Sequence, residues 1–398
     1  MSIGEQTVKQ RTICIMGRLL DQDDGLGVYS ANLLRHMFKL DRNSHYLILL
    51  RSDKHALLFK SYPNVRTKVV PSRSKLWWDQ VVVPIAARRA RADIILNLKF
   101  SLPLFSRIPG VFVLHGSDWY INPRNYPWWD NIYIRTMMPI YCRKAVRMLS
   151  ISQVVIDDLI KYAGLDASKV TPSYAAAGEH FRRIEDQEIL QQFVSRYQLP
   201  MRFMMTVGRV HHTGHDHLGE YPGGNNERLI KAFCRYRAAG GTLPLVVVGR
   251  NIEQYLRRHG FDKGSLKDIH FTGFIPNQEI VLVYNLTEFL VLATLYESFS
   301  IPLIEAMACG CPAMVPSTGG CPEVAQDAAY FIDPMNVQSI AEGMLTLERS
   351  ADLRAKMRET GLKRAKMFTW QRTAEVTIKV LDEIVPRIKM DLGTEKSV

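Results

Sequence analysis

The sequence of 398 residues has no uninterrupted apolar run near the roughly 20 residues that a membrane-spanning helix requires. Its opening residues, MSIGEQTVKQR, are polar and lack the apolar core of a signal peptide. The chain also lacks low-complexity segments. These absences argue against an integral membrane protein, a secreted protein and a disordered protein. They predict a globular, cytoplasmic protein with enough apolar residues for two ordinary domains.

Cysteine is scarce, since the chain contains only Cys14, Cys142, Cys234, Cys309, Cys311 and Cys321. Six residues at these spacings do not form a disulfide framework, which agrees with a reducing cytoplasm. The pair Cys309-x-Cys311 could suggest metal or redox chemistry. However, the first cysteine ends a predicted helix and the second begins a predicted strand, so a structural role is favoured.

Acidic residues are under-represented in the first half of the chain. Residues 1–180 hold 25 Lys and Arg against 14 Asp and Glu, whereas residues 181–398 hold 26 against 25. Five of the six tryptophans also lie in the first half. This composition suggests an anionic partner, such as membrane headgroups or a lipid-phosphate acceptor, although a merely basic surface with core tryptophans explains it too. No nucleic-acid recognition motif is present, so nucleic acid is not expected.

Short apolar segments alternate with helical patterns along the whole chain, which is typical of α/β proteins with parallel sheets. The first half predicts strands over 12–16, 45–50, 93–98, 110–115 and 145–151, and the second over 203–208, 244–249, 269–274, 289–293 and 312–315. We therefore expect two Rossmann-like, doubly wound domains. Ligands would bind in the interdomain cleft, at the carboxyl ends of the strands.

The polar stretch FRRIEDQEILQQFVSRYQLP separates the two series of strands. It places an N-terminal, acceptor-binding domain over residues 1–185 and a C-terminal, nucleotide-sugar-binding domain over residues 200–365. Residues 366–398 predict a final helix that packs back toward the N-terminal domain.

The segment YESFSIPLIEAMACG, residues 296–310, directly follows the apolar run FLVLA. That run predicts a strand buried on both faces of a parallel sheet. Pro302 favours the first turn of a helix, Gly310 favours the position just after its end, and Pro312 prevents its continuation. The segment therefore predicts a strand, a tight turn and a short helix over 300–309.

Two glutamates flank this predicted turn, Glu297 within it and Glu305 one turn into the helix. The turn presents backbone N–H groups at the positive end of the helix, where an anion binds readily. A ligand with a central phosphate and hydroxyl-bearing sugars on both sides, such as a nucleoside diphosphate sugar, suits this arrangement. An ordinary strand–helix unit with two solvated glutamates is the alternative.

The first predicted strand leads into a glycine turn, GLG, that opens a helix. Gly27 in this turn could let the backbone approach a phosphate or an acceptor closely, although the turn is not a complete GxGxxG motif. Asp21-Gln22-Asp23 formally matches the D-x-D of metal-dependent glycosyltransferases, but an acidic loop before a helix explains it equally well. No metal site is expected.

His115 and Arg209 each follow a predicted strand and should lie at the interdomain cleft. His115 is a candidate site residue, and a satisfied structural histidine is the alternative. The Arg209 guanidinium suits a pyrophosphate, because it is always charged and binds two oxygens at once. The histidines of the loop 211–217 could bind a transition metal, but without an anchoring carboxylate pattern or fixed secondary structure a flexible or acceptor-facing insertion is favoured.

A set of motifs along nearly the whole chain resembles the family 4 retaining glycosyltransferases of the GT-B fold: GLGVYS, VLHGSDW, VGR, HFTGFIPNQEI, YESFSIPLIEAMACGCPAMVPSTGGCPEV and FTWQRTAEVTIKVL. The C-terminal half carries the more specific motifs. The resemblance implies that Glu305 holds the ribose hydroxyls of the donor and that Glu297 hydrogen-bonds the transferred sugar. It further implies that the amides of Phe299, Ser300 and Ile301 cradle the distal phosphate.

The same resemblance assigns the rest of the donor site. Arg209 would neutralise the pyrophosphate, with Gly208 of the VGR motif beside the donor. Backbone around Phe274 and Ile275 would meet the base. His115 would lie near the transferred sugar, and Gly27 near the phosphate or the acceptor. The family needs no metal and no cofactor besides the UDP- or GDP-sugar. It retains the anomeric configuration, with the leaving diphosphate accepting the proton of the acceptor.

Two features depart from the family pattern. The family has a lysine before the helix that follows VGR, as a second cation for the pyrophosphate, whereas this chain has Gly223-Gly224 there. Ser298 and Ser300 replace the small glycines of the phosphate turn, a change that the sequence indicates to be mild. We expect a histidine of the loop or an N-terminal arginine such as Arg18 to compensate for the lysine, or activity to be low.

The expected function is therefore the transfer of a hexose, with retention and without metal, from a UDP- or GDP-sugar to a glycolipid, a lipid-linked glycan or a polysaccharide. The basic, tryptophan-rich first half would contact an anionic membrane surface peripherally. Two alternatives remain. The chain could be a catalytically weak, nucleotide-sugar-binding subunit of a transferase complex, or it could act on a small soluble acceptor.

Overall fold

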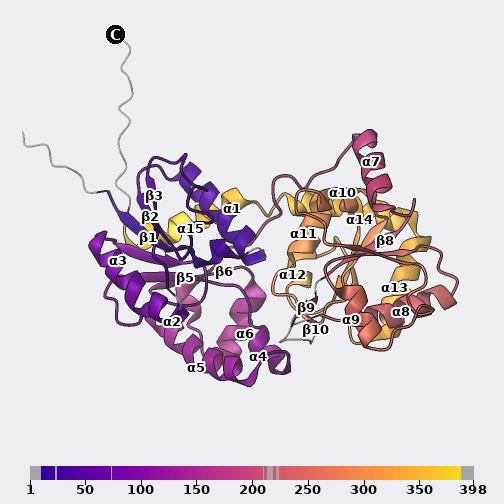
Figure 1. The fold of residues 1–398 in the computed structure, drawn as a ribbon, viewed down its shortest axis with the longest axis horizontal. Coiled ribbons are helices and arrows are strands. Elements are labelled where there is room, and N and C mark those ends of the chain that lie inside the picture. Colours follow the sequence, from indigo (N-terminus) through magenta and orange to yellow (C-terminus); the bar gives the residue numbers. More distant parts are fainter. Residues whose placement is uncertain are drawn as a thin grey trace, which may run out of the picture.

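The computed structural model describes residues 10–22, 25–72, 74–208, 210–212, 218–220 and 224–386. These residues form two α/β lobes that lie side by side (Figure 1). Each lobe has one parallel β-sheet with helices on both faces. The structure confirms the predicted α/β architecture with two doubly wound sheets.

The sheet of the N-terminal lobe has seven parallel strands in the order β3-β2-β1-β4-β5-β6-β7. They span Thr12–Met16 (β1), His45–Leu50 (β2), Val65–Val69 (β3), Ile94–Asn97 (β4), Gly110–Leu114 (β5), Arg147–Ser150 (β6) and Val170–Pro172 (β7). The strand order reverses between β1 and β4. Loops that leave the carboxyl ends of these two neighbours diverge, which opens a crevice where ligands bind in such folds.

Helices cover both faces of this sheet (Figure 1). They span Gly25–Leu40 (α1), Lys75–Trp77 (α2), Val83–Arg89 (α3), Asp118–Ile121 (α4), Trp128–Lys144 (α5) and Gln153–Ala163 (α6), and a 3₁₀ turn, η1, spans Gly17–Asp21. Ser152 directly precedes α6 and caps it, because its side chain accepts a hydrogen bond from the Val155 amide. It ends at Gly164, which adopts a left-handed conformation.

The sheet of the C-terminal lobe has six parallel strands in the order β12-β11-β8-β13-β14-β15. They span Met204–Val207 (β8), Leu245–Val248 (β11), Ile269–Gly273 (β12), Phe289–Val291 (β13), Ala313–Pro316 (β14) and Tyr330–Ile332 (β15). Here the order reverses between β8 and β13. Gly208 of the VGR motif follows β8, and the segment beginning with Tyr296 follows β13 after a few residues. The topology alone therefore brings both segments to the carboxyl ends of two adjacent strands.

The helices of the second half span Gln187–Tyr197 (α7), Asn226–Ala238 (α8), Ile252–Arg258 (α9), Ile280–Leu286 (α10), Ile301–Ala308 (α11), Cys321–Ala325 (α12), Val337–Arg349 (α13), Ala351–Ala365 (α14) and Trp370–Ile384 (α15). Helix α11 has a proline in its first turn, and Gly310 follows its end at a φ of 70°. The predicted helix over 300–309 is thus confirmed within one residue at each end.

Every strand expected from an apolar run is present, whereas β3, β7 and β15 were not predicted. β3 reads VRTKV and lies at the edge of its sheet, so its side chains are largely exposed. Edge strands need no continuous apolar run, because only part of their surface is buried. The apolar runs of the sequence therefore report the central strands and miss three of the four edge strands of the two parallel sheets, whereas the edge strand β12 was predicted.

The last helix, α15, packs along α1 of the N-terminal lobe, although it follows the C-terminal domain in sequence (Figure 1). Arg11 at the start of β1 donates from Nη1 to the Val385 carbonyl at 2.7 Å and pairs with Asp382 at 2.8 Å. Trp370 meets the ring of Tyr29 edge-on, with 5.3 Å between centroids. These contacts fasten the end of the chain to the first lobe.

The predicted lack of fixed structure after the VGR motif is wrong at the base of that loop. Strands β9 (Val210–His212) and β10 (Leu218–Glu220) form an antiparallel hairpin, with Leu218 opposite His212. The tip of the loop, residues 213–217, lies outside the described residues, and so do the side chains of its histidines. A hairpin projecting from a parallel sheet is an insertion rather than part of the core.

Candidate active site

A cavity of about 310 Å³ opens at the carboxyl ends of β8 and β13. It is lined by Thr206, Val207, Gly208, Gly224, Asn225, Asn226, Leu229, Leu292, Ala293, Thr294, Tyr296, Glu297 and Pro302. Two predicted site residues, Gly208 and Glu297, therefore line the same cavity. It lies where the strand order of the C-terminal sheet reverses, the expected place for a ligand.

The turn between β13 and α11 carries Phe299, Ser300 and Ile301. Ser300 is the residue before α11 and adopts the left-handed region at φ 70° and ψ 76°. The first amides of a helix have no intrahelical acceptor, so they and the helix dipole create a positive potential at this turn. Replacing glycine by Ser300 is therefore not mild for the backbone, because a residue with a Cβ is strained there by roughly 1 kcal/mol or more.

The two glycines of the segment STGG, residues 317–320, pack closely against this turn. Gly319 has a φ of 65°, and a Cβ there would lie 2.6 Å from the Glu297 carbonyl oxygen. A Cβ on Gly320 would lie 2.5 Å from the Ser298 carbonyl oxygen, and the Gly320 amide donates to the Glu297 carbonyl at 2.6 Å. Only glycine allows the two backbones to pack this closely. The position of Glu297 therefore depends on the STGG segment.

Glu297 lies half-buried between the lobes, and burial raises the pKa of its carboxyl group to about 7. The Asp118 carboxylate of the N-terminal lobe raises this pKa further, while the nearby Thr294 side chain lowers it and partly opposes the shift. A carboxyl group with a pKa near neutrality can accept or donate a hydrogen bond at physiological pH. The ionised form of Glu297, which accepts hydrogen bonds from sugar hydroxyls, is therefore well populated at physiological pH.

Glu305 lies one turn into α11 and outside the lining of this cavity. The Tyr284 hydroxyl of α10 donates to its Oε2 atom at 3.1 Å. Burial raises the pKa of Glu305 to about 8, and the hydrogen bond from Tyr284 partly opposes this shift. The two glutamates thus flank the N-terminus of α11, one on the cavity side and one on the α10 side.

A polar cluster connects the two lobes beside Glu297. The Ser117 hydroxyl donates to Asp158 at 2.6 Å, and the Tyr296 hydroxyl donates to the same carboxylate at 2.7 Å. Ser117 and Tyr296 lie 2.7 Å apart through their oxygens. Because Tyr296 directly precedes Glu297, this cluster fixes the glutamate turn against the N-terminal lobe.

A second contact between the lobes involves Glu323 of α12. Its carboxylate accepts hydrogen bonds from the amides of Gln153, at 2.8 and 3.0 Å, and Val154, at 3.2 Å. These amides form the first turn of α6, whose positive end favours a carboxylate. The C-terminal lobe therefore caps a helix of the N-terminal lobe.

His115 follows β5, and its Nε2 atom lies 2.6 Å from the Leu98 carbonyl oxygen. Its ring meets Tyr29 edge-on at 4.7 Å between centroids. The next residue, Gly116, lies against the glutamate turn, because a Cβ there would be 2.8 Å from the Ser298 hydroxyl. His115 is thus beside the site, with the ring oriented by the Leu98 carbonyl.

Gly27 is buried near the start of α1, and a Cβ there would lie 1.9 Å from the Gln22 carbonyl oxygen. This clash gives Gly27 a packing role within the first lobe. Gly25 at the helix start is the glycine nearer the site, because a Cβ there would lie 3.9 Å from the Ile301 side chain. The start of α1 therefore faces the start of α11 across the cleft.

The two residues predicted to meet the base differ in exposure. Phe274 is 56% exposed, and the Arg250 guanidinium lies over its ring at 4.1 Å from the centroid. Ile275 is buried, as is Phe299, whose ring packs against Tyr174 and Phe368. Ile275 and Phe299 can therefore offer a ligand only their backbone, while Phe274 also presents a ring face.

Comparison with known proteins identifies the family. Residues 224–364 match the family described as glycosyl transferases group 1, and residues 24–174 match glycosyltransferase family 4. The two matches cover the two lobes separately. The chain belongs to the family 4 glycosyltransferases.

Curated relatives of this glycosyltransferase include the serotype-specific mannosyltransferase WbdA of Escherichia coli, 25% identical over 262 residues. That match covers 64% of this chain and 31% of the relative. A D-inositol 3-phosphate glycosyltransferase of Corynebacterium jeikeium is 27% identical over 232 residues, which cover 56% of this chain and 51% of the relative. The chain spans about a third of the length of the first of these relatives and half of the second.

Solved structures show that the glycosyltransferase has the GT-B fold. The Anabaena protein Alr3699/HepE, in complex with UDP and glucose, superimposes with a TM-score of 0.71 at 16% identity, covering 94% of this chain and 100% of that one. WaaG, a glycosyltransferase involved in lipopolysaccharide biosynthesis, gives a TM-score of 0.67 at 14% identity, covering 94% and 99%. At these identities the likeness concerns the fold alone.

Several predicted positions cannot be placed in the glycosyltransferase. Arg209, Asp23 and Gly223 lie outside the described residues. Gly224, at the site of the missing lysine, lines the cavity. Arg18, considered as a substitute for that lysine, instead pairs with Asp79 of the first lobe at 3.3 Å.

In the described part of the glycosyltransferase, no group of three or more His, Cys, Asp and Glu side chains is arranged to hold a metal ion. Cys309 and Cys311 are buried and unlinked, and burial raises the pKa of the Cys311 thiol to about 12. The neutral thiols therefore belong to the core.

Sequence reasoning assigned no role to Tyr296, Asp158, Glu323, Gly319 or Gly320. The adjacent glycines after a predicted strand were a usable signal, since such pairs mark a close backbone approach. The interlobe contacts left no signal in the sequence. They join residues more than a hundred positions apart, which neither periodicity nor spacing brings together.

Proposed function

We propose that this glycosyltransferase transfers a hexose from a UDP- or GDP-sugar, with retention and without a metal, to a glycolipid, a lipid-linked glycan or a polysaccharide. The observation that carries the proposal is the pair Glu297 and Glu305, which flank the N-terminus of α11, with Glu297 in the turn held by Gly319 and Gly320. Two carboxylates on either side of a helix N-terminus suit a ligand whose phosphate binds the helix amides and whose hydroxyl groups lie on both sides of that phosphate.

In this proposal the α11 amides receive the distal phosphate, where negative charge grows as the sugar leaves. Donors aimed at developing charge accelerate a reaction because they need no reorganisation during the step. Glu305 binds the ribose hydroxyls, and Glu297 binds the hexose. The leaving phosphate accepts the proton of the acceptor hydroxyl on the same face, which accounts for retention.

The names of the relatives do not single out one donor class. One structural neighbour was solved with UDP and glucose, and several relatives are mannosyltransferases. Ile275 can present only its backbone atoms, and the exposed ring of Phe274 can stack on any base, so these residues leave the base open. We therefore keep UDP- and GDP-sugars as equal candidates for the donor.

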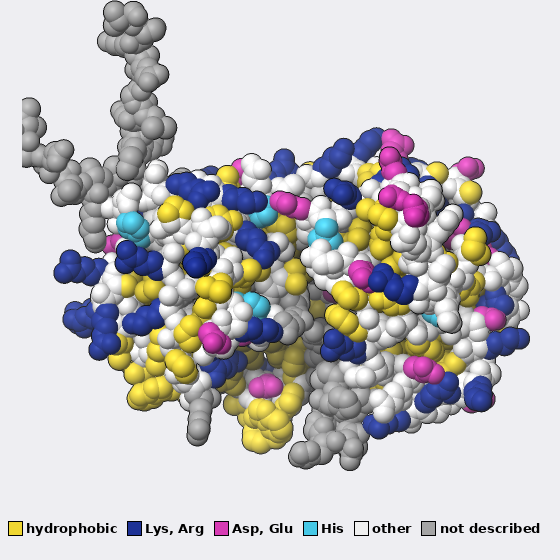
Figure 2. Space-filling view, turned by 45° about the horizontal axis from the view of Figure 1, so that its top comes forward, with side chains coloured by type: hydrophobic (Ala, Val, Ile, Leu, Met, Phe, Trp, Pro, Cys, Tyr) yellow, Lys and Arg dark blue, Asp and Glu magenta, His cyan; other side chains and the backbone are white. Residues whose placement is uncertain are grey.

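The proposal places the enzyme in the cytoplasm, in peripheral contact with an anionic membrane. No helix in the described ranges is long and apolar enough to cross a bilayer. The N-terminal lobe exposes several large apolar side chains, among them Trp77, Phe105, Trp128 and Trp129. Figure 2 shows hydrophobic side chains along the lower edge of this lobe and Lys and Arg side chains over its face. Such a surface suits anionic headgroups.

A second candidate function is a nucleotide-sugar-binding subunit with little turnover of its own. Gly224 favours it, because the cavity has no lysine side chain at that position. Losing one charge next to the pyrophosphate weakens leaving-group stabilisation by about 3 kcal/mol, the cost of one well-placed donor.

The deciding experiment is turnover of the purified chain with UDP- and GDP-hexoses in the presence of a chelator, with lipid-linked acceptors. Nuclear magnetic resonance of the product gives the anomeric configuration. We expect a retained configuration and turnover that disappears in Glu297→Ala. Tight nucleotide binding with no turnover on any acceptor would favour the subunit, and an inverted product would contradict the mechanism.

A further inference from the structure

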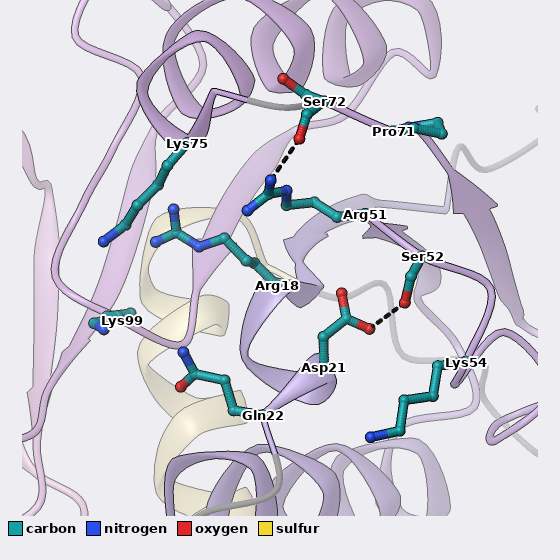
Figure 3. Close-up of a pocket in the computed structure, with 10 residues that line it drawn as sticks. All are labelled: Arg18, Asp21, Gln22, Arg51, Ser52, Lys54, Pro71, Ser72, Lys75 and Lys99. Atoms are coloured by element: carbon teal, nitrogen blue, oxygen red, sulfur yellow. Dashed lines mark hydrogen bonds between the residues drawn. The ribbon is translucent and has the colours of Figure 1, made fainter. Parts of the chain in front are cut away.

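A cavity of about 780 Å³ lies in the N-terminal lobe, outside the lining of the donor site (Figure 3). Five cationic side chains and a single carboxylate line it: Arg18, Arg51, Lys54, Lys75, Lys99 and Asp21. No role in donor binding accounts for these residues. A cavity with this excess of positive charge is built for an anion.

The cations come from different elements that meet at the carboxyl ends of the strands. Arg18 lies in η1 after β1, Arg51 directly follows β2, and Lys99 follows β4. Lys75 opens α2. The strands β1 and β4 are neighbours at which the strand order reverses, so this is the natural ligand crevice of the first sheet.

The two arginines of this basic pocket are held in place before any ligand arrives. Arg18 pairs with the buried Asp79 at 3.3 Å. Arg51 donates from Nη2 to the Ser72 carbonyl. Figure 3 shows the Arg18 guanidinium between the Arg51 guanidinium and the Lys75 ammonium. A preformed arrangement lowers the entropic cost of binding.

The cations of the basic pocket also destabilise one another. Burial lowers the pKa of Lys75, and the positive charges of Arg18 and Arg51 lower it further. Burial likewise lowers the pKa of Arg18, with Arg51 adding to the effect and Asp79 opposing it. An anion among them removes this repulsion, and a phosphate group can accept hydrogen bonds from several of them at once.

Helix α2 connects the basic pocket to an apolar groove. Lys75 belongs to the pocket, whereas the next two residues, Leu76 and Trp77, line a groove of about 330 Å³ together with Phe105 and Met137. Trp77 is 58% exposed and Phe105 is 92% exposed. A charged pocket and an apolar groove on the two sides of one short helix suit a ligand with an anionic head and an apolar chain.

The basic pocket lies beside the site of transfer. Lys99 neighbours Leu98, whose carbonyl holds His115. Gln22 lines the pocket and contacts Gly27 in the turn that faces α11. A ligand anchored in the pocket can therefore extend a sugar toward the cleft without competing with the donor diphosphate for the α11 amides.

From these observations we infer that the acceptor is a lipid phosphate or diphosphate. Its phosphate binds in the basic pocket formed by Arg18, Arg51 and Lys75, and its apolar chain lies in the groove formed by Trp77 and Phe105. The inference rests on the proposed transferase function, since it names the acceptor of that reaction. It divides recognition between a head group and a chain, and the two can be tested separately.

The test is co-sedimentation of the full chain with phosphatidylcholine vesicles that contain phosphatidic acid, a phosphate monoester on an apolar anchor. Vesicles with phosphatidylserine, matched in surface charge, are the control lipid. We expect stronger binding to phosphatidic acid, competition by soluble glycerol 3-phosphate, and a loss of about 10-fold or more in Arg51→Gln/Lys75→Gln, as expected for charge-assisted hydrogen bonds.

A matched control changes two cations of the same lobe outside the basic pocket. Arg88→Gln/Arg89→Gln removes the same charge from exposed positions on α3 and should preserve the preference for phosphatidic acid. Trp77→Ser/Phe105→Ser should weaken vesicle binding and leave the affinity for glycerol 3-phosphate unchanged. Thermal unfolding of each variant excludes loss of the fold.

The outcomes separate the sources of the phosphate. Equal binding to both anionic vesicles, or an equal loss in the α3 variant, would overturn the inference in favour of diffuse charge attraction. Tight binding of glycerol 3-phosphate with no contribution from Trp77 and Phe105 would overturn the lipid part. UDP and GDP titrations of the same proteins test the donor site independently, so failure of the proposed transferase function is distinguishable.

Discussion

The two lobes share one architecture and recognise ligands by different means. In the C-terminal lobe the site consists of helix amides, two carboxylates and glycines that allow two backbone segments to pack closely. The sequence of this lobe is nearly neutral. In the N-terminal lobe the pocket consists of Arg and Lys side chains at the ends of the strands. Backbone recognition tolerates variation in most side chains, whereas the basic pocket exists only while its cations do.

The largest expected effect concerns the carboxylate between the lobes. Glu297→Gln keeps the size of the side chain and removes its charge, so the hexose loses its charged partner. We expect turnover to fall by roughly 100-fold or more, as for other groups that act in the transition state. Steady-state kinetics with the best donor measure the change. Wild-type turnover in this variant would remove Glu297 from the site.

The glycine support should be the next most sensitive feature. Gly319→Ala places a Cβ against the Glu297 carbonyl at a left-handed φ, and we expect a loss of about 1–3 kcal/mol in the free energy of unfolding, with lower turnover. Gly164→Ala is the matched control in the other lobe, because its φ is 64° and nothing lies within 4 Å of its Cβ. Equal effects of the two substitutions in chemical denaturation would contradict the close approach.

The interlobe contacts should have a smaller effect on chemistry than on the coupling of the lobes. Tyr296→Phe removes the hydroxyl bonded to Asp158, and Glu323→Gln weakens the cap on α6. A lost hydrogen bond to a charged group is worth roughly 1.5–3 kcal/mol. Because most of this loss falls on the contact between the lobes and only part on the turn, we expect each change to raise the KM for the donor only a few-fold. An unchanged KM in both would show that the contacts do not position the turn.

The smallest effect is the pH dependence of stability. Glu297 and Glu305 have raised pKa values, about 7 and about 8, so the folded state binds their protons more tightly than the unfolded state does. Their contribution to stability is therefore present at low pH and declines as the pH rises through these values. The Tm without ligand should fall by a few degrees between pH 5.5 and 8.5, about what one or two kcal/mol produces.

Glu297→Gln/Glu305→Gln is the control for this pH dependence. The double variant cannot ionise at these positions, so its Tm should change less over the same range. A decline as steep as that of the wild type would mean that other groups cause it.

The sequence predicts the buried frame of the fold well, because strands covered on both faces need continuous apolar runs. The runs over 12–16 and 289–293 each led to a strand, and the Pro and Gly around α11 marked its ends. The edge strand β3 was missed because its alternation is weak and charged residues occupy it. Topology followed from the βα alternation, since parallel strands require crossover helices.

The site was predictable to the extent that it depends on neighbours in sequence. Glu297, Glu305 and the α11 turn lie within one segment, and the structure places them at one helix end. The Tyr296–Asp158 and Glu323–α6 contacts join distant segments, and only the folded chain reveals them. The basic pocket had a compositional signal, the excess of Lys and Arg before residue 180, but composition does not show that five of these cations line one cavity.

The division of labour between the lobes can be tested directly by calorimetric titration of UDP and GDP into three proteins without metal. These are the wild type, Glu305→Ala, and Arg51→Gln/Lys75→Gln. We expect the wild type to bind one of the two nucleotides with micromolar affinity. Glu305→Ala should lower this affinity by about 10-fold or more, and Arg51→Gln/Lys75→Gln should leave it unchanged. Nucleotide binding that survives Glu305→Ala and disappears with the N-terminal cations would contradict it.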